Sequence, residues 1–184
     1  MEDLRMYPVE LHGELVRLRE FRMDDVDAAL EIVGNDTVAR WLSFDSRDRD
    51  QTTDMLKGAV ERSQLVPREE YYLAVVLPGS DRVVGFVRLG LTGVKAAKLG
   101  YAVHADSWGK GYASDAARTM ITFGFGELDL HRITAAIGPD NESSISVVKK
   151  LGFQYEGCLR DHVFTNGAWR DSLLYSLLTS EWNG

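Results

Sequence analysis

Apolar residues recur along this chain with two different periods, and these periods predict its strands and helices. Apolar residues at every second position, or in short unbroken runs, predict strands, whereas spacings of three and four predict helices. The predicted strands occupy 14–20, 71–77, 83–91, 97–105, 132–137, 153–163 and 170–178. The predicted helices occupy 24–35, 50–66, 113–128 and 141–151.

The order of these elements predicts a mixed sheet. The turn "PGSDR" joins two strands into a hairpin, and Asn166-Gly167 is a hairpin signal near the end of the chain. Between the hairpins, a strand, a helix and a strand follow one another, which predicts a right-handed crossover and a parallel pair. We therefore expect an α/β fold whose mixed, largely antiparallel sheet has a central parallel pair and helices on both faces. The charged stretch at 43–50 is predicted to be a link.

A glycine-rich turn, "SWGKGYASDA", lies between the strand predicted at 97–105 and the helix predicted at 113–128. The N-terminus of a helix offers unpaired N–H groups and therefore suits an anion. Gly109 and Gly111 allow the backbone to approach a phosphate closely, and Lys110 adds a positive charge. The same residues are equally compatible with a tight turn that binds nothing.

Two well-known phosphate loops do not fit this turn. The pattern GxxxxGK followed by Ser or Thr fails, because His104 stands at its first glycine and Gly111 follows the lysine. The dinucleotide pattern GxGxxG lacks its third glycine, since Ser114 stands there.

Composition narrows the class of protein. The length of 184 residues predicts a single domain over 1–184, and 45% hydrophobic residues suffice for a core. A net charge of −7 argues against nucleic acid as a partner and mildly favours a cationic acceptor. The lone Cys158 excludes an internal disulfide, and neither a signal peptide nor an apolar run of membrane-spanning length is present. We expect a soluble, cytoplasmic protein with no membrane partner.

Several segments together resemble the GNAT N-acetyltransferases. These segments are "LVRLREFRMDDVDAALEIV", "LGYAVHADSWGKGYASDA", "PDNESSISVVKKLGF" and "WRDSLLYSLL". The likeness covers most of the chain, is weakest over 36–70, and is greatest to the RimJ/RimL-type branch, which acetylates N-terminal α-amino groups of ribosomal proteins and various small amines. It implies acetyl-CoA as acetyl donor and direct attack by a primary amine in a ternary complex. The implied acceptor is a protein N-terminus, with ribosomal proteins included, or a small-molecule amine. Dimers are common in this family.

The resemblance assigns the glycine turn to coenzyme A. The family pattern has Gln or Arg, two residues, Gly, one residue, then Gly or Ala. The matching positions, whose backbone N–H groups would hold the pyrophosphate, are Trp108, Gly109, Lys110, Gly111, Tyr112 and Ala113. Trp108 departs from Gln or Arg at the first position. The strand around Val103 would pair with the pantetheine arm, and the thioester would lie between 99–104 and 132–138.

Two residues of "PDNESSISVV" are the candidate catalytic groups. Asn141 matches the family asparagine that contacts the pantetheine arm and orders water, although it or Asp140 also suits a helix N-cap. Ser144 matches the family residue whose hydroxyl can donate to the departing sulfur. The alternative interpretation of Ser144 is that it is an ordinary polar residue in the first turn of the helix.

The general base has no match in the family pattern. Many relatives place a glutamate just before or early in the strand predicted at 97–105, but Lys95 to Lys98 contain no carboxylate. Candidates from elsewhere, each also explicable as a surface or structural residue, are Glu20, His104, Asp106, Asp161 and His162. A site without a strong base favours an α-amine, with a pKa near 8, over lysine, near 10.4.

Acceptor contacts and rival functions stay open at this point. The candidate acceptor contacts are Glu20, Phe44, Trp169 and Tyr175, with a structural role such as core packing as the alternative. One rival function is a non-catalytic acyl-CoA-binding domain, which the missing carboxylate favours. The other is a dinucleotide-dependent oxidoreductase that uses Gly109 and Gly111. Serine hydrolase and zinc patterns are absent from the sequence, so no metal site is expected.

Overall fold

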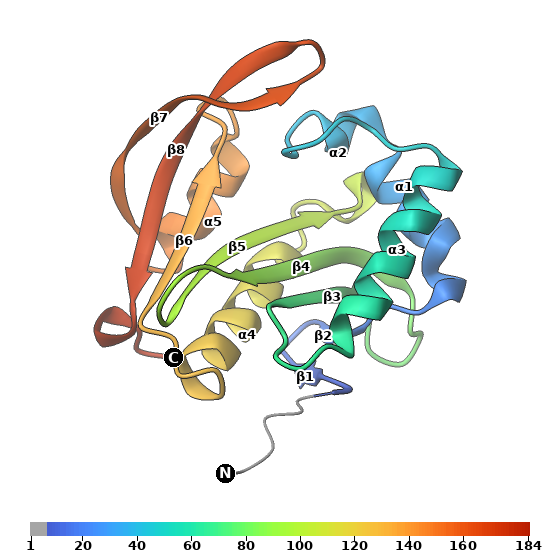
Figure 1. Cartoon of the computed structure of the whole chain (residues 1–184), viewed down its shortest axis with the longest axis horizontal. Coiled ribbons are helices and arrows are strands. Elements are labelled where there is room, and N and C mark those ends of the chain that lie inside the picture. Colours follow the sequence, from blue (N-terminus) through green and yellow to red (C-terminus); the bar gives the residue numbers. More distant parts are fainter. Residues whose placement is uncertain (1–6) are drawn as a thin grey trace.

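A computed structural model describes residues 7–184 (Figure 1). Its strands are β1 (Glu10–His12), β2 (Arg17–Glu20), β3 (Glu70–Val76), β4 (Val83–Leu91), β5 (Ala96–Val103), β6 (Arg132–Ile137), β7 (Gln154–Thr165) and β8 (Ala168–Leu178). Its helices are α1 (Val26–Val33), α2 (Asp36–Ala39), α3 (Arg49–Ser63), α4 (Tyr112–Gly126) and α5 (Glu142–Lys150). Short 3₁₀ helices occupy Met23–Asp25, Ala105–Ser107 and Thr179–Glu181. The interpretation of the N-terminal stretch falls mostly on residues 1–6, which lie outside the described part.

The strands of residues 7–184 form one sheet in the order β1-β2-β3-β4-β5-β6-β8-β7. Every neighbouring pair is antiparallel except β5 and β6, which are parallel and are joined by the crossover helix α4 (Figure 1). The predicted mixed, largely antiparallel sheet with a central parallel pair is therefore confirmed. The structure adds β1 and α2, which are too short to give a periodic signal.

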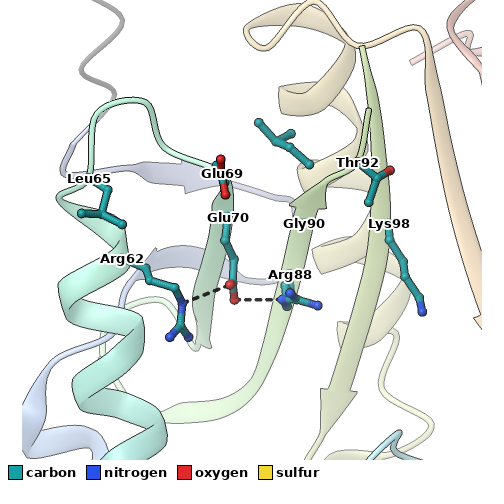
Figure 2. Close-up of a pocket in the computed structure, with 9 residues that line it drawn as sticks. Arg62, Leu65, Glu69, Glu70, Arg88, Gly90, Thr92 and Lys98 are labelled. Atoms are coloured by element: carbon teal, nitrogen blue, oxygen red, sulfur yellow. Dashed lines mark hydrogen bonds and ion pairs between the residues drawn. The ribbon is translucent and has the colours of Figure 1, made fainter. Parts of the chain in front are cut away.

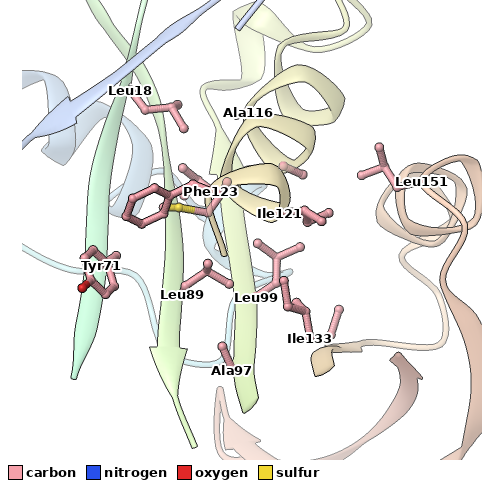
Figure 3. Close-up of a cluster of buried hydrophobic side chains, with 14 of the residues drawn as sticks. Leu18, Tyr71, Leu89, Ala97, Leu99, Ala116, Ile121, Phe123, Ile133 and Leu151 are labelled. Atoms are coloured by element: carbon pink, nitrogen blue, oxygen red, sulfur yellow. The ribbon is translucent and has the colours of Figure 1, made fainter. Parts of the chain in front are cut away.

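Helices cover both faces of the sheet and enclose two hydrophobic cores. The larger core packs α4 and α5 on one face, and its cluster of buried side chains includes Ala116 and Ile121 of α4 and Leu89 and Leu99 of the sheet (Figure 3). The smaller core packs α1, α2 and α3 on the other face. Within residues 7–184, no helix has both the length and the apolar character needed to cross a membrane.

The first predicted strand begins later than its alternating pattern suggests. The N–H groups of Glu14, Leu15 and Val16 donate to the carboxylate of Asp115, at 3.1, 2.8 and 3.0 Å. Because these N–H groups bind a side chain, they do not enter the ladder, and β2 starts at Arg17. A Cβ at Gly13 would collide with the same carboxylate, so glycine is required there.

The first long helix also begins later than predicted. Asp25 was expected to open it but is buried, and it forms a paired contact with Arg19 at 2.8 and 2.9 Å. Helix α1 therefore starts at Val26. The predicted hairpin turn at the other end of the chain is confirmed, because Asn166 and Gly167 both have positive φ, 52° and 73°.

Candidate active site

Strands β5 and β6 diverge after three paired positions and open a cleft between them. Ala96 to Lys98 pair with Arg132 to Thr134, and the ladder then stops. Beyond it lies a cleft of about 750 Å³, lined by 99–103 on one side and 135–137 on the other. The opening lies where the two strands were predicted to separate.

Along the edge of β5 that faces this cleft, backbone groups are left out of the ladder with β4. The N–H of His104 donates to the carbonyl of Val84 at 2.7 Å. The neighbouring Val103–Gly85 pair is therefore a non-hydrogen-bonded pair of the antiparallel ladder, in which the N–H and C=O groups point away from the partner strand. The N–H and C=O of Val103, and by alternation those of Tyr101, therefore point away from β4 and toward the cleft. The indole Nε1 of Trp108 donates to the Val103 carbonyl at 2.9 Å.

The glycine turn leads from this edge into the start of α4. Gly109 and Gly111 both have positive φ, 73° and 80°. Gly111 is the N-cap of α4, and no side chain of residues 7–184 caps the first N–H groups of the helix. Of the predicted turn residues, Trp108 and Ala113 line the cleft, while the four between them border it without lining it. An uncapped helix start beside the cleft is a favourable place for an anion.

Asn141 and Ser144 lie on the opposite wall of the cleft, at the start of α5. The Asn141 side chain accepts a hydrogen bond from the Ser144 N–H at 3.2 Å, which confirms that Asn141, rather than Asp140, is the N-cap. The hydroxyl of Tyr101 donates to the Ser144 carbonyl at 3.3 Å. Burial raises the pKa of Tyr101 to about 12, so this cleft residue, which the motifs did not reveal, stays protonated.

Four of the five candidate bases lie elsewhere. Glu20 forms a buried ion pair with Arg68 at 2.7 and 3.0 Å. The Nδ1 of His104 accepts the N–H of Asp106 at 3.2 Å, which fixes both at the start of a 3₁₀ helix. Asp161 donates its N–H to Asp171. None of these four candidates is among the residues of 7–184 that line the cleft.

The fifth candidate, His162, does line the cleft. Its Nδ1 lies 2.9 Å from the hydroxyl of Ser172. Burial, together with the positive charge of Lys98, lowers the pKa of His162 below its usual value of 6.5. The imidazole is therefore neutral at pH 7 and able to accept a proton.

Charged side chains gather at the end of the cleft where β3, β4 and β5 run side by side (Figure 2). Glu70 accepts from the Nε atoms of Arg62 and Arg88, at 3.1 and 2.8 Å. Glu70 and Lys98 both stand opposite Gly90 in the ladder, so one row contains a carboxylate and an ammonium. A carboxylate from β3 therefore lies beside β5, which has none of its own, and two arginines bind it.

The tip of the β7–β8 hairpin reaches over the cleft to the loop after α2. Arg170 donates to the carbonyls of Arg40 and Leu42, at 2.6 and 2.7 Å. The N–H of Asn166 donates to Asp45 at 2.7 Å. Loop 40–47 is therefore more than a charged link, since it forms part of the cleft wall.

The three aromatic residues proposed as acceptor contacts lie in different environments. Phe44 lines the cleft as expected. Trp169 is 60% exposed, packs on Phe164 and is absent from the lining within residues 7–184, so its predicted place is wrong. Tyr175 is buried in the core against Tyr155.

Sequence comparisons identify relatives along most of the chain. Residues 16–154 match the family model described as the acetyltransferase (GNAT) domain. A Bacillus licheniformis protein named "Uncharacterized N-acetyltransferase p20" is 29% identical over 177 residues, which are 95% of this chain and 98% of that protein. The ribosomal protein uS5-alanine N-acetyltransferase of Escherichia coli (strain K12) is 30% identical over 115 residues, 61% of this chain and 59% of that enzyme.

Solved structures share the fold. Mycobacterium smegmatis RimJ, in complex with CoA-disulfide, matches with a TM-score of 0.84 at 26% identity, over 97% of this chain and 91% of that one. A GNAT-family acetyltransferase from Bacillus anthracis matches with a TM-score of 0.83 at 24% identity, over 94% of this chain and 100% of that one.

Proposed function

Because the chain belongs to the GNAT family of N-acetyltransferases, we propose that it transfers the acetyl group of acetyl-CoA to a primary amine. The amine attacks directly, in a ternary complex. The observation that carries this proposal is the free edge of β5, which runs along the cleft and ends at the uncapped start of α4. The RimJ relative, solved with a CoA-disulfide, supports the choice of cofactor.

Different parts of the site suit the pantetheine arm and the pyrophosphate of coenzyme A. The outward N–H and C=O groups of Tyr101 and Val103 suit the amides of an extended arm, as an added strand would. The Val103 carbonyl already receives the Trp108 indole, which leaves its N–H as the main group for the arm at that residue. Backbone N–H groups from Trp108 to Ala113, beside the positive end of α4, suit the pyrophosphate.

Acetyl-CoA supplies an acetyl thioester. In the proposed reaction, the Nε2 of His162 accepts the proton that the attacking amine loses, directly or through one water. The Ser144 hydroxyl donates a proton to the sulfur as the C–S bond breaks and the N–C bond forms, and regains it from solvent. The Asn141 side chain holds α5 in place through its oxygen and offers its NH₂ group to the arm or to a water.

An α-amine suits this site better than a lysine side chain. His162, with its lowered pKa, is a weak base, and Glu70 is held by two arginines. A weak base is sufficient for an α-amine with a pKa near 8, but it leaves lysine almost wholly charged. The acceptor that we propose is therefore an α-amino group, of a protein N-terminus or of a small molecule.

Thiol release from acetyl-CoA over a panel of peptides and small amines tests this function. We expect turnover with free N-termini and little with N-acetylated peptides whose amine is a lysine. Calorimetric titration with acetyl-CoA runs in parallel. Binding without turnover on the whole panel would assign the chain to a non-catalytic acyl-CoA-binding role, and a lack of binding would refute the function altogether.

A further inference from the structure

The end of the cleft beside α3 has a strongly positive local charge, although the whole chain is acidic. Four cationic side chains and one carboxylate line it: Arg47, Arg62, Arg88, Lys98 and Glu70. Burial raises the pKa of Tyr72, another cleft residue, and the charges of Arg47 and Arg88 oppose this rise. The overall charge of −7, which favoured a cationic acceptor, is therefore reversed at this end of the cleft.

Many donors at this end have no hydrogen-bond partner in the described part of the chain. Arg62 and Arg88 each use Nε for Glu70, and their terminal nitrogens make no hydrogen bond within residues 7–184. Lys98 forms no ion pair with any side chain of the described part, and in Figure 2 it extends alone from β5. The guanidinium of Arg47 lies over the Phe44 ring at 4.5 Å, with its Nε buried and unpaired. Such donors are satisfied by an anion.

This cationic end is distinct from the end proposed for the coenzyme A pyrophosphate. Lys98 and Val103 stand at opposite ends of the cleft edge of β5, five residues apart, which is about 16 Å in a strand. The other carboxylates of the lining, Asp140 and Glu142, belong to the α5 wall. Beyond Lys98, a smaller pocket of about 270 Å³ continues along the sheet and adds Glu69.

Building on the proposed acetyl transfer, we propose that the acceptor is a primary amine carrying an anionic group, a carboxylate or a phosphate, and that Lys98, Arg88 and Arg47 bind this group. Glu70 orients Arg88 through its Nε and leaves the terminal nitrogens of that arginine directed to the ligand. A polyamine or a lysine-rich segment would meet a net positive charge here.

The same cations also favour the reactive form of the acceptor. Burial and the charge of Arg88 lower the pKa of Lys98 itself. An acceptor ammonium held near these side chains experiences the same field, so its pKa falls and more of it is neutral. The anionic group thus brings the amine to a place where it loses its proton without a strong base.

Matched peptides test the proposal. One pair compares Ala-Glu amide, which carries a carboxylate, with the neutral Ala-Gln amide. The other compares Ala-phosphoserine amide, which carries a phosphate, with the neutral Ala-Ser amide. The two pairs therefore show which of the two anionic groups the site prefers. We expect kcat/KM to be about tenfold higher for at least one anionic member than for its neutral partner. Lys98→Met should reduce that preference to about twofold or less, whereas Lys57→Met, which removes an exposed charge from α3, should preserve it.

The outcomes separate this proposal from the function on which it rests. Turnover of anionic and neutral peptides at equal rates would overturn the proposal and leave acetyl transfer intact. An anion preference that survives Lys98→Met would also overturn it. If no amine turns over, calorimetry with the N-acetylated Glu and Gln peptides in the presence of coenzyme A decides: equal affinities overturn the anion site, and tighter binding of the Glu peptide supports it.

Discussion

The indole Nε1 of Trp108 donates a hydrogen bond to the carbonyl oxygen of Val103, and this contact fastens the glycine turn to the end of β5. Trp108 stands where the family pattern has Gln or Arg, so the departure in sequence has a structural role. The indole sets the position of the uncapped start of α4 relative to the free edge of the strand. Both of these features belong to the proposed coenzyme A site.

Trp108→Phe removes this hydrogen bond and keeps an aromatic ring. We expect the affinity for coenzyme A to fall about fivefold, because one hydrogen bond contributes about 1 kcal/mol. Calorimetric titration measures the change. Trp169→Phe, on the exposed hairpin, is the matched control, and equal affinities of the two variants would remove Trp108 from the site.

Substitutions of Asn141 separate its two roles. Asn141→Asp retains an oxygen that caps α5 but loses the NH₂ group, so we expect an unchanged melting temperature and a lower kcat/KM. Asn141→Ala also loses the cap and should unfold at a lower temperature, with a loss of about 1 kcal/mol. Equal activity of Asn141→Asp and the native protein would limit Asn141 to capping.

Ser144→Ala tests the proposed proton donor. The hydroxyl makes no hydrogen bond within residues 7–184, so we expect stability to be retained and kcat to fall by about tenfold to a hundredfold. Steady-state kinetics with thiol release, alongside thermal unfolding, provides the measurement. Ser143→Ala, one residue earlier on α5, is the control. Unchanged kcat would remove Ser144 from the reaction.

His162 should set the acidic limb of the pH profile. Its pKa is lowered by burial and by Lys98, so the imidazole should stay neutral, and the native protein active, to a pH below 6.5. Removing the charge in Lys98→Met stabilises the imidazolium, which raises the pKa of His162 and moves the acidic limb to higher pH. NMR titration of the His162 ring and the pH dependence of kcat/KM measure the two shifts. An acidic limb that does not move with the ring pKa would exclude His162 as the base.

Arg170→Met releases the loop after α2 from the hairpin. We expect the KM for the amine to rise several-fold while the affinity for coenzyme A stays unchanged, since the two carbonyls bound by Arg170 belong to loop 40–47, the part of the cleft wall that contains the candidate acceptor contact Phe44. Arg160→Met, exposed on β7, serves as the control. A parallel loss of coenzyme A affinity would contradict a role confined to that wall.

Much of the architecture was accessible from the sequence because it depends on local periodicity. Strands β3 to β6 and helices α4 and α5 follow their apolar patterns within one or two residues. The start of β2 was missed, because it depends on Asp115, which lies about 100 residues away. Motif matching identified Trp108 and Asn141 as candidate site residues, because the residues that follow each of them along the chain match the family pattern.

The charged end of the cleft was not predictable in the same way. Alternation along a strand tells which face a residue occupies, but not which residue of the next strand stands beside it. Glu70 and Lys98 share a row only through the register of β3, β4 and β5 around Gly90. Each of these charges, taken alone in the sequence, is indistinguishable from a surface residue.

The hydrogen bonds of Arg170 also have a consequence for the order in which the protein becomes active. They join positions 130 and 128 residues apart, and β8 takes its place in the sheet between β6 and β7. During synthesis, β5, the glycine turn and α4 are all made before Arg170. The link between loop 40–47 and the β7–β8 hairpin therefore forms only after the strand edge and the helix start that flank the proposed coenzyme A site have been made. The contact that closes this side of the cleft is added last, with the final strand.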